Sequence, residues 1–167
     1  MKRFWWVLLT APLFLQFQTS RGSFAGSWEL DLKNSVNLPP SFKSVDSYVI
    51  DIAQKGDSLT VVATMKGNGQ TVPFPPFVYS LDGKETYRKD SLRGSERWMS
   101  AGWAANGKSV VMDTRVLMKQ AGRPAVEMTQ HDDWKLVGGT SLDVSITQKM
   151  KGTDSVRTER RIFRKLK

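Results

Sequence analysis

The sequence contains no cysteine and a single histidine among its 167 residues. Without cysteine the chain forms no disulfide framework, thiol nucleophile, redox pair or thiolate zinc site. One histidine excludes every site that needs two, including the metalloprotease helix motif. The sequence also lacks a nucleophile elbow, a phosphate-binding loop and a calcium-binding loop. We therefore expect no cofactor, no metal site and no catalysis.

The composition is that of a folded chain. Hydrophobic residues make up 40% of the sequence, and six residues are tryptophan, which is too much apolar mass for a disordered protein. The length fits one domain.

The start of the chain has the three parts of a secretory signal peptide. Two basic residues come first, a nearly unbroken apolar run follows over residues 4–17, and Ser20 and Gly22 are small residues at the spacing of a signal-peptidase site. The run has 14 residues, whereas a membrane-spanning helix needs about 20, so an uncleaved anchor is the less favoured alternative. We predict that residues 1–22 are a Sec-type signal peptide, cleaved after Gly22.

The remaining residues, 23–167, are predicted to be one domain that is secreted or periplasmic. Removing the first 22 residues leaves 22 basic and 16 acidic residues, a net charge of +6. This charge favours solubility and at most a weak association with an anionic membrane or envelope surface. The chain has no cysteine for lipid attachment, so we do not expect a lipoprotein. Export and the interleaving of basic with acidic residues argue against a nucleic-acid partner.

Apolar and polar residues alternate with a period of two along this domain, and no amphipathic helix pattern interrupts them. Turn signals, such as Asp82-Gly83, Asn106-Gly107 and Gly138-Gly139, separate the alternating segments. The pattern predicts about nine or ten strands. The segments are 24–32, 48–53, 59–65, 77–81, 98–104, 110–118, 126–136, 142–148 and 156–166.

Consecutive hairpins predict an up-and-down antiparallel meander. Closing this meander into a barrel would bury its apolar face and protect its edge strands. We therefore predict an all-β, antiparallel up-and-down barrel of about 8–10 strands, wide enough to hold a small ligand. The alternative is a two-sheet β-sandwich, which usually needs long crossovers, whereas the only long connection here spans residues 33–44.

The first predicted strand resembles that of the calycin superfamily, the lipocalins and fatty-acid-binding proteins. Residues 24–30, FAGSWEL, carry the Gly-x-Trp pattern of these families, with an aromatic residue two positions before the glycine. The resemblance is greatest to small secreted lipocalin-like proteins of bacteria. It implies that Trp28 lies inside the closed end of a barrel, where an arginine from the last strand packs over its indole.

Two arginines of the last strand are candidates for that position. Alternation with Val156 and Ile162 favours Arg160 as the inward residue. The ending of fatty-acid-binding proteins, Arg-x-Tyr, resembles Arg161 and Phe163 and favours Arg161. Phe163 lacks the tyrosine hydroxyl, so the carboxylate site of that family would be incomplete.

Polar and aromatic residues on the predicted inner face are the candidate binding residues. Thr114, Gln130, Asp132, Gln148 and Arg160 are in phase with apolar positions, so they either satisfy one another or line a hydrated cavity. Inner methionines suit an adaptable binding surface, although they also fill gaps in cores. The predicted ligand-binding residues are Trp28, Tyr79, Trp98, Met112, Met128, Gln130, Trp134, Arg160 and Arg161.

His131 precedes two aspartates and would be the obvious candidate for acid–base chemistry or metal binding. Adjacent residues of a strand point to opposite faces of the sheet, which makes a cluster of His131, Asp132 and Asp133 the less favoured alternative. Its phase places His131 on the solvent face.

These features predict an exported protein that binds a small apolar or amphipathic molecule in a barrel cavity, without catalysis. The alternative is an envelope-associated interaction protein with a filled barrel and a basic outer face. An enzyme built in the cavity is a third, less favoured, function. An interior volume on the order of several hundred Å³ would favour the ligand-binding function.

Expressed from its native start, the protein should appear in the periplasm or the medium. N-terminal sequencing should then find a chain that begins at or near Ser23, because cleavage follows the small-residue site. Recovery of the full-length chain from the cytosol would contradict the prediction.

Overall fold

The computed structural model describes residues 21–90, 94–119, 122 and 124–167. These residues form eleven strands and a single 3-10 helix, η1, over Pro40–Ser44, so the predicted all-β class is confirmed. None of the described helical residues could span a membrane. Residues 1–20 of the predicted signal peptide lie outside the described residues. The strands are β1 Gly26–Leu30, β2 Ser47–Lys55, β3 Ser58–Gly67, β4 Gln70–Pro73, β5 Phe77–Ser80, β6 Thr86–Asp90, β7 Ser95–Trp103, β8 Ser109–Met118, β9 Val126–Val137, β10 Ser141–Met150 and β11 Val156–Lys165.

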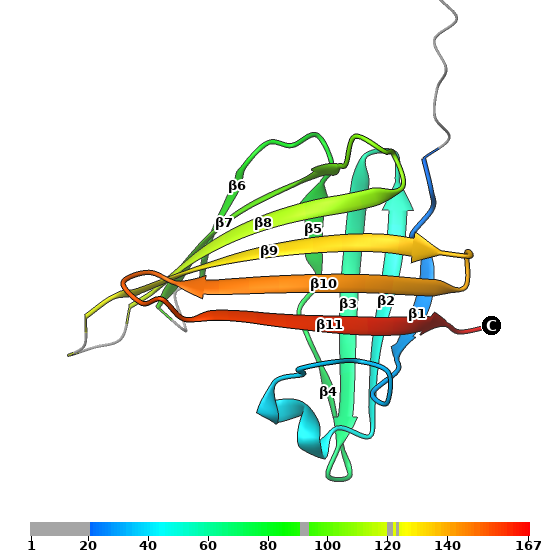
Figure 1. Cartoon of the computed structure of the whole chain (residues 1–167), viewed down its shortest axis with the longest axis horizontal. Helices are drawn as coiled ribbons and strands as arrows, with labels where there is room; N and C mark the ends of the chain where they lie inside the picture. The colour runs from blue at the N-terminus through cyan, green and yellow to red at the C-terminus, as the bar shows by residue number, and fades with distance from the viewer. Residues whose placement is uncertain (1–20, 91–93, 120–121, 123) are drawn as a thin grey trace, which may run out of the picture.

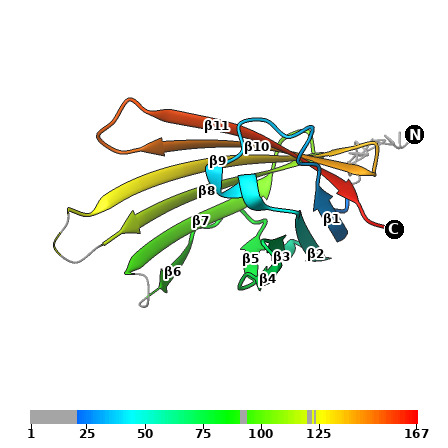
Figure 2. The same cartoon turned by 90° about the horizontal axis from the view of Figure 1, so that it is seen from below.

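All eleven strands belong to one antiparallel sheet. Ten of them pair in the order β4-β3-β2-β1-β11-β10-β9-β8-β7-β6, and β5 pairs with β3. Most pairs are consecutive hairpins, as the turn signals predict, whereas β1 with β11 joins the two ends of the chain. The sheet bends so that the half formed by β1–β5 faces the half formed by β7–β11, with the strands of the two halves crossing (Figures 1 and 2).

Strand pairing does not close the sheet into the predicted barrel. The Asp82-Gly83 turn signal predicts a hairpin there, but β5 pairs with β3 and β6 pairs with β7. Only an isolated bridge between Asp82 and Gly102 joins the end of β5 to β7. The backbone N–H of Lys84 donates to the Asp82 carboxylate over 3.0 Å, within the turn that leads from β5 to β6.

Two strands, β4 and β6, are absent from the sequence prediction. β4 is exposed along its whole length, and the described side chains of β6 are exposed too. Neither strand therefore has a buried face to impose a period of two on its sequence. β4 and β5 are two parts of one edge against β3, separated by a segment rich in proline, which cannot donate to a ladder.

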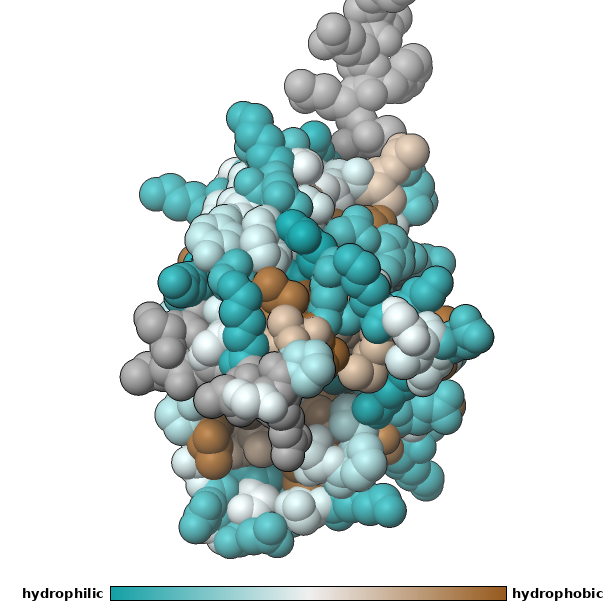
Figure 3. All heavy atoms as spheres, turned by 90° about the vertical axis from the view of Figure 1, so that its left-hand side faces the viewer, coloured by the Kyte–Doolittle hydropathy of each residue, from teal (hydrophilic) through white to brown (hydrophobic). Residues whose placement is uncertain are grey.

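The core lies between the two halves of the sheet, and apolar side chains reach the surface in small groups. At the end of the molecule that carries the β10–β11 turn, Val126, Met150 and Val156 are exposed. The surface there is mostly hydrophilic, with small apolar patches (Figure 3). The buried hydrophobic cluster consists of Phe24, Trp28, Leu30, Ile50, Ile52, Leu59, Val61, Leu81, Ala101, Val110, Met112, Trp134, Leu142, Val144, Ile146 and Phe163.

Trp28 is inward and fully buried, with 0% of its surface exposed, as predicted. Its indole Nε1 donates to the carbonyl oxygen of Phe24 over 2.9 Å. The cation over its ring is Lys165, whose Nζ lies 5.1 Å from the ring centroid, so the prediction of an arginine is wrong. Register explains the difference, because Lys165 is the residue of β11 opposite Trp28.

Gly26 provides the space for this lysine. A Cβ atom at Gly26 would lie 2.7 Å from Cε of Lys165, and the φ of +133° is one that other residues rarely adopt. The glycine of the Gly-x-Trp pattern therefore allows the Lys165 side chain to lie over the Trp28 ring.

Replacing Trp28 with alanine should lower the free energy of unfolding by about 3–5 kcal/mol, as large-to-small aromatic changes in cores do. Denaturant unfolding of the two proteins measures the difference. Trp98→Ala, at a half-buried position on the outer face, is the matched control and should cost less. A Trp28→Ala protein within about 0.5 kcal/mol of wild type would remove the argument for a structural role.

Candidate functional site

A cavity of about 200 Å³ lies between the two halves of the sheet. Hollows at the β10–β11 turn, of about 480 Å³, and beside the C-terminal residues, of about 710 Å³, are larger, but mostly exposed residues line them. The inner cavity has polar groups Arg97, Gln130, Asp132 and Arg161. Its aromatic wall consists of Tyr48, Phe74, Phe77, Tyr79, Trp134 and Phe163.

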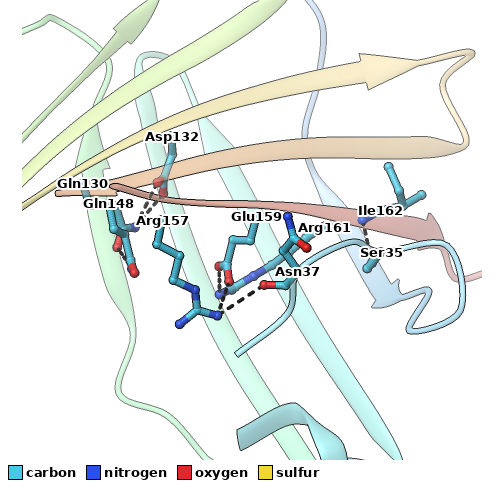
Figure 4. A network of polar contacts seen from close by, with 9 residues as sticks. All are labelled: Ser35, Asn37, Gln130, Asp132, Gln148, Arg157, Glu159, Arg161 and Ile162. Atoms are coloured by element: carbon cyan, nitrogen blue, oxygen red, sulfur yellow. Dashed lines mark hydrogen bonds and ion pairs between the residues drawn. The ribbon is translucent and has the colours of Figure 1, made fainter. Parts of the chain in front are cut away.

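Two glutamines hold a carboxylate at the wall of this cavity (Figure 4). Gln148 Nε2 donates to Gln130 Oε1 over 2.8 Å. Gln130 Nε2 donates to both oxygens of Asp132, at 2.9 and 3.1 Å. Gln130 and Gln148 lie opposite each other in β9 and β10, and the period of a strand places Gln130 and Asp132 on the same face. The chain of amides therefore fixes the orientation of the Asp132 carboxylate.

A buried ion-paired group from β11 lies beside it. Glu159 is only 5% exposed and accepts hydrogen bonds from Arg161 and, over 3.3 Å, from Nη2 of Arg157. Arg157 also donates to the carbonyl oxygen of Asn37 (Figure 4). The Cζ atom of Arg161 lies 5.2 Å from the ring centroid of Phe42 in η1. These contacts hold Arg161 in place.

Two buried donors at the cavity have no hydrogen-bond partner among the described residues, Arg161 Nε and Trp134 Nε1. The Arg161 side chain is 20% exposed, and Trp134 is 8% exposed. The Trp134 indole lies close enough to Asp132 to lower the pKa of that carboxyl, without forming a hydrogen bond of normal geometry.

Burial governs the titration of the acidic groups of the cavity. It raises the pKa of Asp132 to about 6, against the opposing effects of the Gln130 hydrogen bond and the Arg161 charge. Burial also raises the pKa of Tyr79 to about 12, so the Tyr79 hydroxyl stays protonated over the physiological range. Asp132 therefore changes charge near neutral pH.

Of the predicted binding residues, Tyr79, Gln130, Trp134 and Arg161 line the cavity. Alternation with Val156 led to the prediction of an inward Arg160, which is wrong. Arg160 points outward, and its Nε donates to the Asp143 carboxylate over 2.9 Å.

Trp98 is also misplaced by the sequence prediction. It lies on the outer face, where Cζ of Arg115 is 3.9 Å from its ring centroid and Tyr87 packs against it. Apolar residues occupy two adjacent positions of β7, Trp98 and Met99, so alternation alone does not decide which faces inward. Met99 is buried, and Arg97, in phase with it, lines the cavity.

The other three predicted binding residues lie away from the cavity wall. Trp28 and Met112 are buried in the core. Met128 is half-buried, one inward position before Gln130 on β9, and does not line the cavity.

Sequence reasoning placed Asp132 on the inner face, where it lines the cavity, but it missed two other charged residues at or beside this site. Glu159 could have been found from phase, since it lies two residues before the inward Arg161. Arg97 carries no such signal, because an arginine that begins an alternating segment is ordinarily assigned to solvent. It lies inside with its Cζ 5.1 Å from the Phe77 ring centroid.

His131 lies on the outer face, as predicted, with Nδ1 2.8 Å from the Asp113 carboxylate. Asp133, next to the inward Asp132, is exposed. Among the described residues, no group of three histidine, aspartate or glutamate side chains could hold a metal ion.

No family model matches the chain, and no curated protein has significant sequence similarity to it. Aromatic walls combined with a few fixed polar groups are typical of sites that bury the body of a small molecule and orient its head.

Folding raises the pKa of Asp132, so the free energy of unfolding should fall as the pH rises and this carboxyl ionises. The stabilisation is present below the unfolded pKa of 3.8 and is lost as the pH rises through about 6. Over this window the wild type should lose roughly 2–3 kcal/mol of unfolding free energy relative to Asp132→Asn. Denaturant unfolding at several pH values measures the difference.

Asp133→Asn, on the outer face of the same strand, is the matched control for removal of a carboxylate. A constant difference between wild type and Asp132→Asn from pH 4 to pH 7 would argue against the buried state of Asp132.

Proposed function

We propose that this protein is an exported, lipocalin-like binding protein that holds a small apolar or amphipathic molecule in its inner cavity and carries out no reaction. The observation that carries the proposal is a cavity with aromatic walls that two arginines, Arg97 and Arg161, also line. Apolar walls with a few polar or charged groups are typical of sites for small molecules.

The chemistry of the walls supports a ligand with two unlike ends. The aromatic side chains, including Phe77 and Tyr79, would bury an apolar body. The charged guanidinium of Arg161 would orient an acidic or hydrogen-bonding head, because hydrogen bonds to charged donors are the stronger and more directional ones.

The proposal includes an incompletely closed barrel of the lipocalin kind. In the ring β1-β2-β3-β5-β7-β8-β9-β10-β11, every neighbouring pair forms a ladder except β5 with β7, which the Asp82–Gly102 bridge connects. Continuous pairing through one sheet supports a barrel more than a sandwich of two separate sheets. The burial of Trp28 beneath Lys165, a cation from the last strand, supports the resemblance to calycins.

The alternative function, an interaction protein with a filled barrel and a basic outer face, has less support. The interior is not packed solid, although its 200 Å³ cavity is smaller than the several hundred Å³ that ligand sites usually have. Several outer cations are also neutralised, including Lys119 by Glu96 and Lys151 by Glu127.

Titration of amphipathic probes into delipidated protein tests the binding function. Medium-chain acids, quinone-like molecules and their neutral analogues should change the fluorescence of Trp134 in a saturable way, because that indole lines the cavity. Arg161→Gln should weaken acidic probes by about tenfold or more and neutral probes less, since only the acidic head loses a charged donor.

Arg160→Gln is the matched control, because it removes the neighbouring arginine, which faces outward. Its affinities should equal those of wild type. If no probe saturates below about 0.1 mM, an affinity of roughly −5.5 kcal/mol, the interaction-protein function should replace the proposal.

A further inference from the structure

Two arginines lie directly opposite each other on the inner face of β6 and β7. Arg88 of β6 is the partner of Arg97 of β7 in the register of this ladder. The adjacent cross-strand pair, Tyr87 and Trp98, packs together on the outer face, so alternation turns the two arginines inward. Arg97 lines the cavity. Arg88 is exposed and belongs to the last strand in the order of the sheet (Figure 2).

This arginine pair, Arg88 and Arg97, is unfavourable for the fold. Residues directly opposite in an antiparallel ladder have Cβ atoms about 4.5–5.5 Å apart, and like charges at that separation destabilise the sheet. Proteins retain such locally unfavourable choices mainly at functional sites, where they serve binding at the expense of stability. An anion held between the two guanidinium groups would replace their repulsion with attraction.

The arginine pair is connected to the aromatic wall of the cavity. The Cζ atom of Arg97 lies 5.1 Å from the centroid of the Phe77 ring. Burial raises the pKa of the Tyr79 hydroxyl, and the positive charges of Arg97 and Arg88 oppose that rise, so both arginines lie near this part of β5. An anionic group bound by the pair would therefore place an attached apolar body along Phe77 and Tyr79.

The other arginine of the cavity wall differs in its surroundings. Arg161 forms an ion pair with Glu159, whose side chain is buried, and Arg157 lies 3.3 Å from the same carboxylate. Strands β8, β9 and β10 separate β11 from β7 in the sheet. The protein itself thus supplies an anion to Arg161, and the arginine pair of β6 and β7 is a second, separate basic group.

Two neighbouring guanidinium groups suit a tetrahedral dianion. Each guanidinium can donate two parallel hydrogen bonds in a fork that matches the oxygens of a phosphate group. A phosphate monoester offers three such oxygens and carries a charge of about −1.5 to −2 at pH 7. A carboxylate or a sulfate ester carries a single charge, so it balances only one of the two arginines.

We propose that Arg88 and Arg97 clamp the phosphate monoester head of an amphipathic ligand at the edge of the cavity, with its apolar body against Phe77 and Tyr79. This inference rests on the proposed binding function and adds the chemical class of the head group and the residues that select it.

Isothermal titration calorimetry of the purified protein at pH 7.5 with octyl phosphate, octyl sulfate and octanol tests the inference. Octyl phosphate and octyl sulfate have the same chain and a tetrahedral head but differ in charge, and octanol is the neutral control. We expect octyl phosphate to bind about 10-fold more tightly than octyl sulfate, because only the dianion balances both arginines. Octanol should bind most weakly.

Arg88→Gln and Arg97→Gln should each weaken the binding of octyl phosphate by about tenfold or more and bring its affinity close to that of octyl sulfate. Lys89→Gln is the matched control. It removes the cation next to Arg88, which is exposed and lies opposite Glu96 on the outer face. This variant should keep the preference of wild type for octyl phosphate.

The stability of the free protein distinguishes a clamp from a purely structural role. Because the two arginines repel each other, Arg88→Gln should raise the midpoint of thermal unfolding in a chloride buffer. Inorganic phosphate at the same ionic strength should raise the midpoint of wild type more than that of the variant, since it stabilises the form that binds it. A lower midpoint for Arg88→Gln, together with an unchanged affinity for octyl phosphate, would assign the pair a structural role and overturn the inference.

Failure of the inference and failure of the proposed function give different results. If none of the three octyl probes, nor the wider set of amphipathic probes, binds to the protein, the binding function itself is wrong. If octyl sulfate or octanol binds as tightly as octyl phosphate, or if Lys89→Gln weakens octyl phosphate as much as Arg88→Gln does, the cavity still binds ligands but the phosphate clamp is wrong.

Discussion

The pairing of the first strand with the last is the contact on which the interior depends. β1 pairs with β11 through Trp28, Glu29 and Leu30, and this ladder joins the half made by β1–β5 to the half made by β7–β11. Without it the chain would form two sheets, each with an apolar face in water. Because the paired residues are more than 130 positions apart, the loop must close before the core can form, which is a costly step for a β-protein.

Once the halves face each other, the polar groups that they bury must satisfy one another. Glu159 has two arginine partners, and Asp132 accepts both of its hydrogen bonds from Gln130. A buried carboxylate without such partners would cost several kcal/mol. The acceptors are thus satisfied within the protein, whereas donor capacity is left over at Arg161 and Trp134.

The sequence predicted the strands that have one buried face and the turns between them. It did not predict β4 and β6, because strands exposed on both faces carry no alternation. At the site, the period-two alternation correctly predicted that Gln130 and Trp134 point inward. It failed where two adjacent residues are equally suited to the inner face. Trp98 and Met99 are both apolar, and Arg160 and Arg161 are identical. Only the register with a neighbouring strand decides which of each pair points inward, and register is a property of the whole sheet.

The open seam of the sheet lies at its short strand β5. Prolines between β4 and β5 interrupt the pairing of this edge with β3. β5 is four residues long, and a bridge just after its end connects it to β7. The same short strand supplies Phe77 and Tyr79 to the wall of the cavity. The open seam and one wall of the cavity therefore share this short strand.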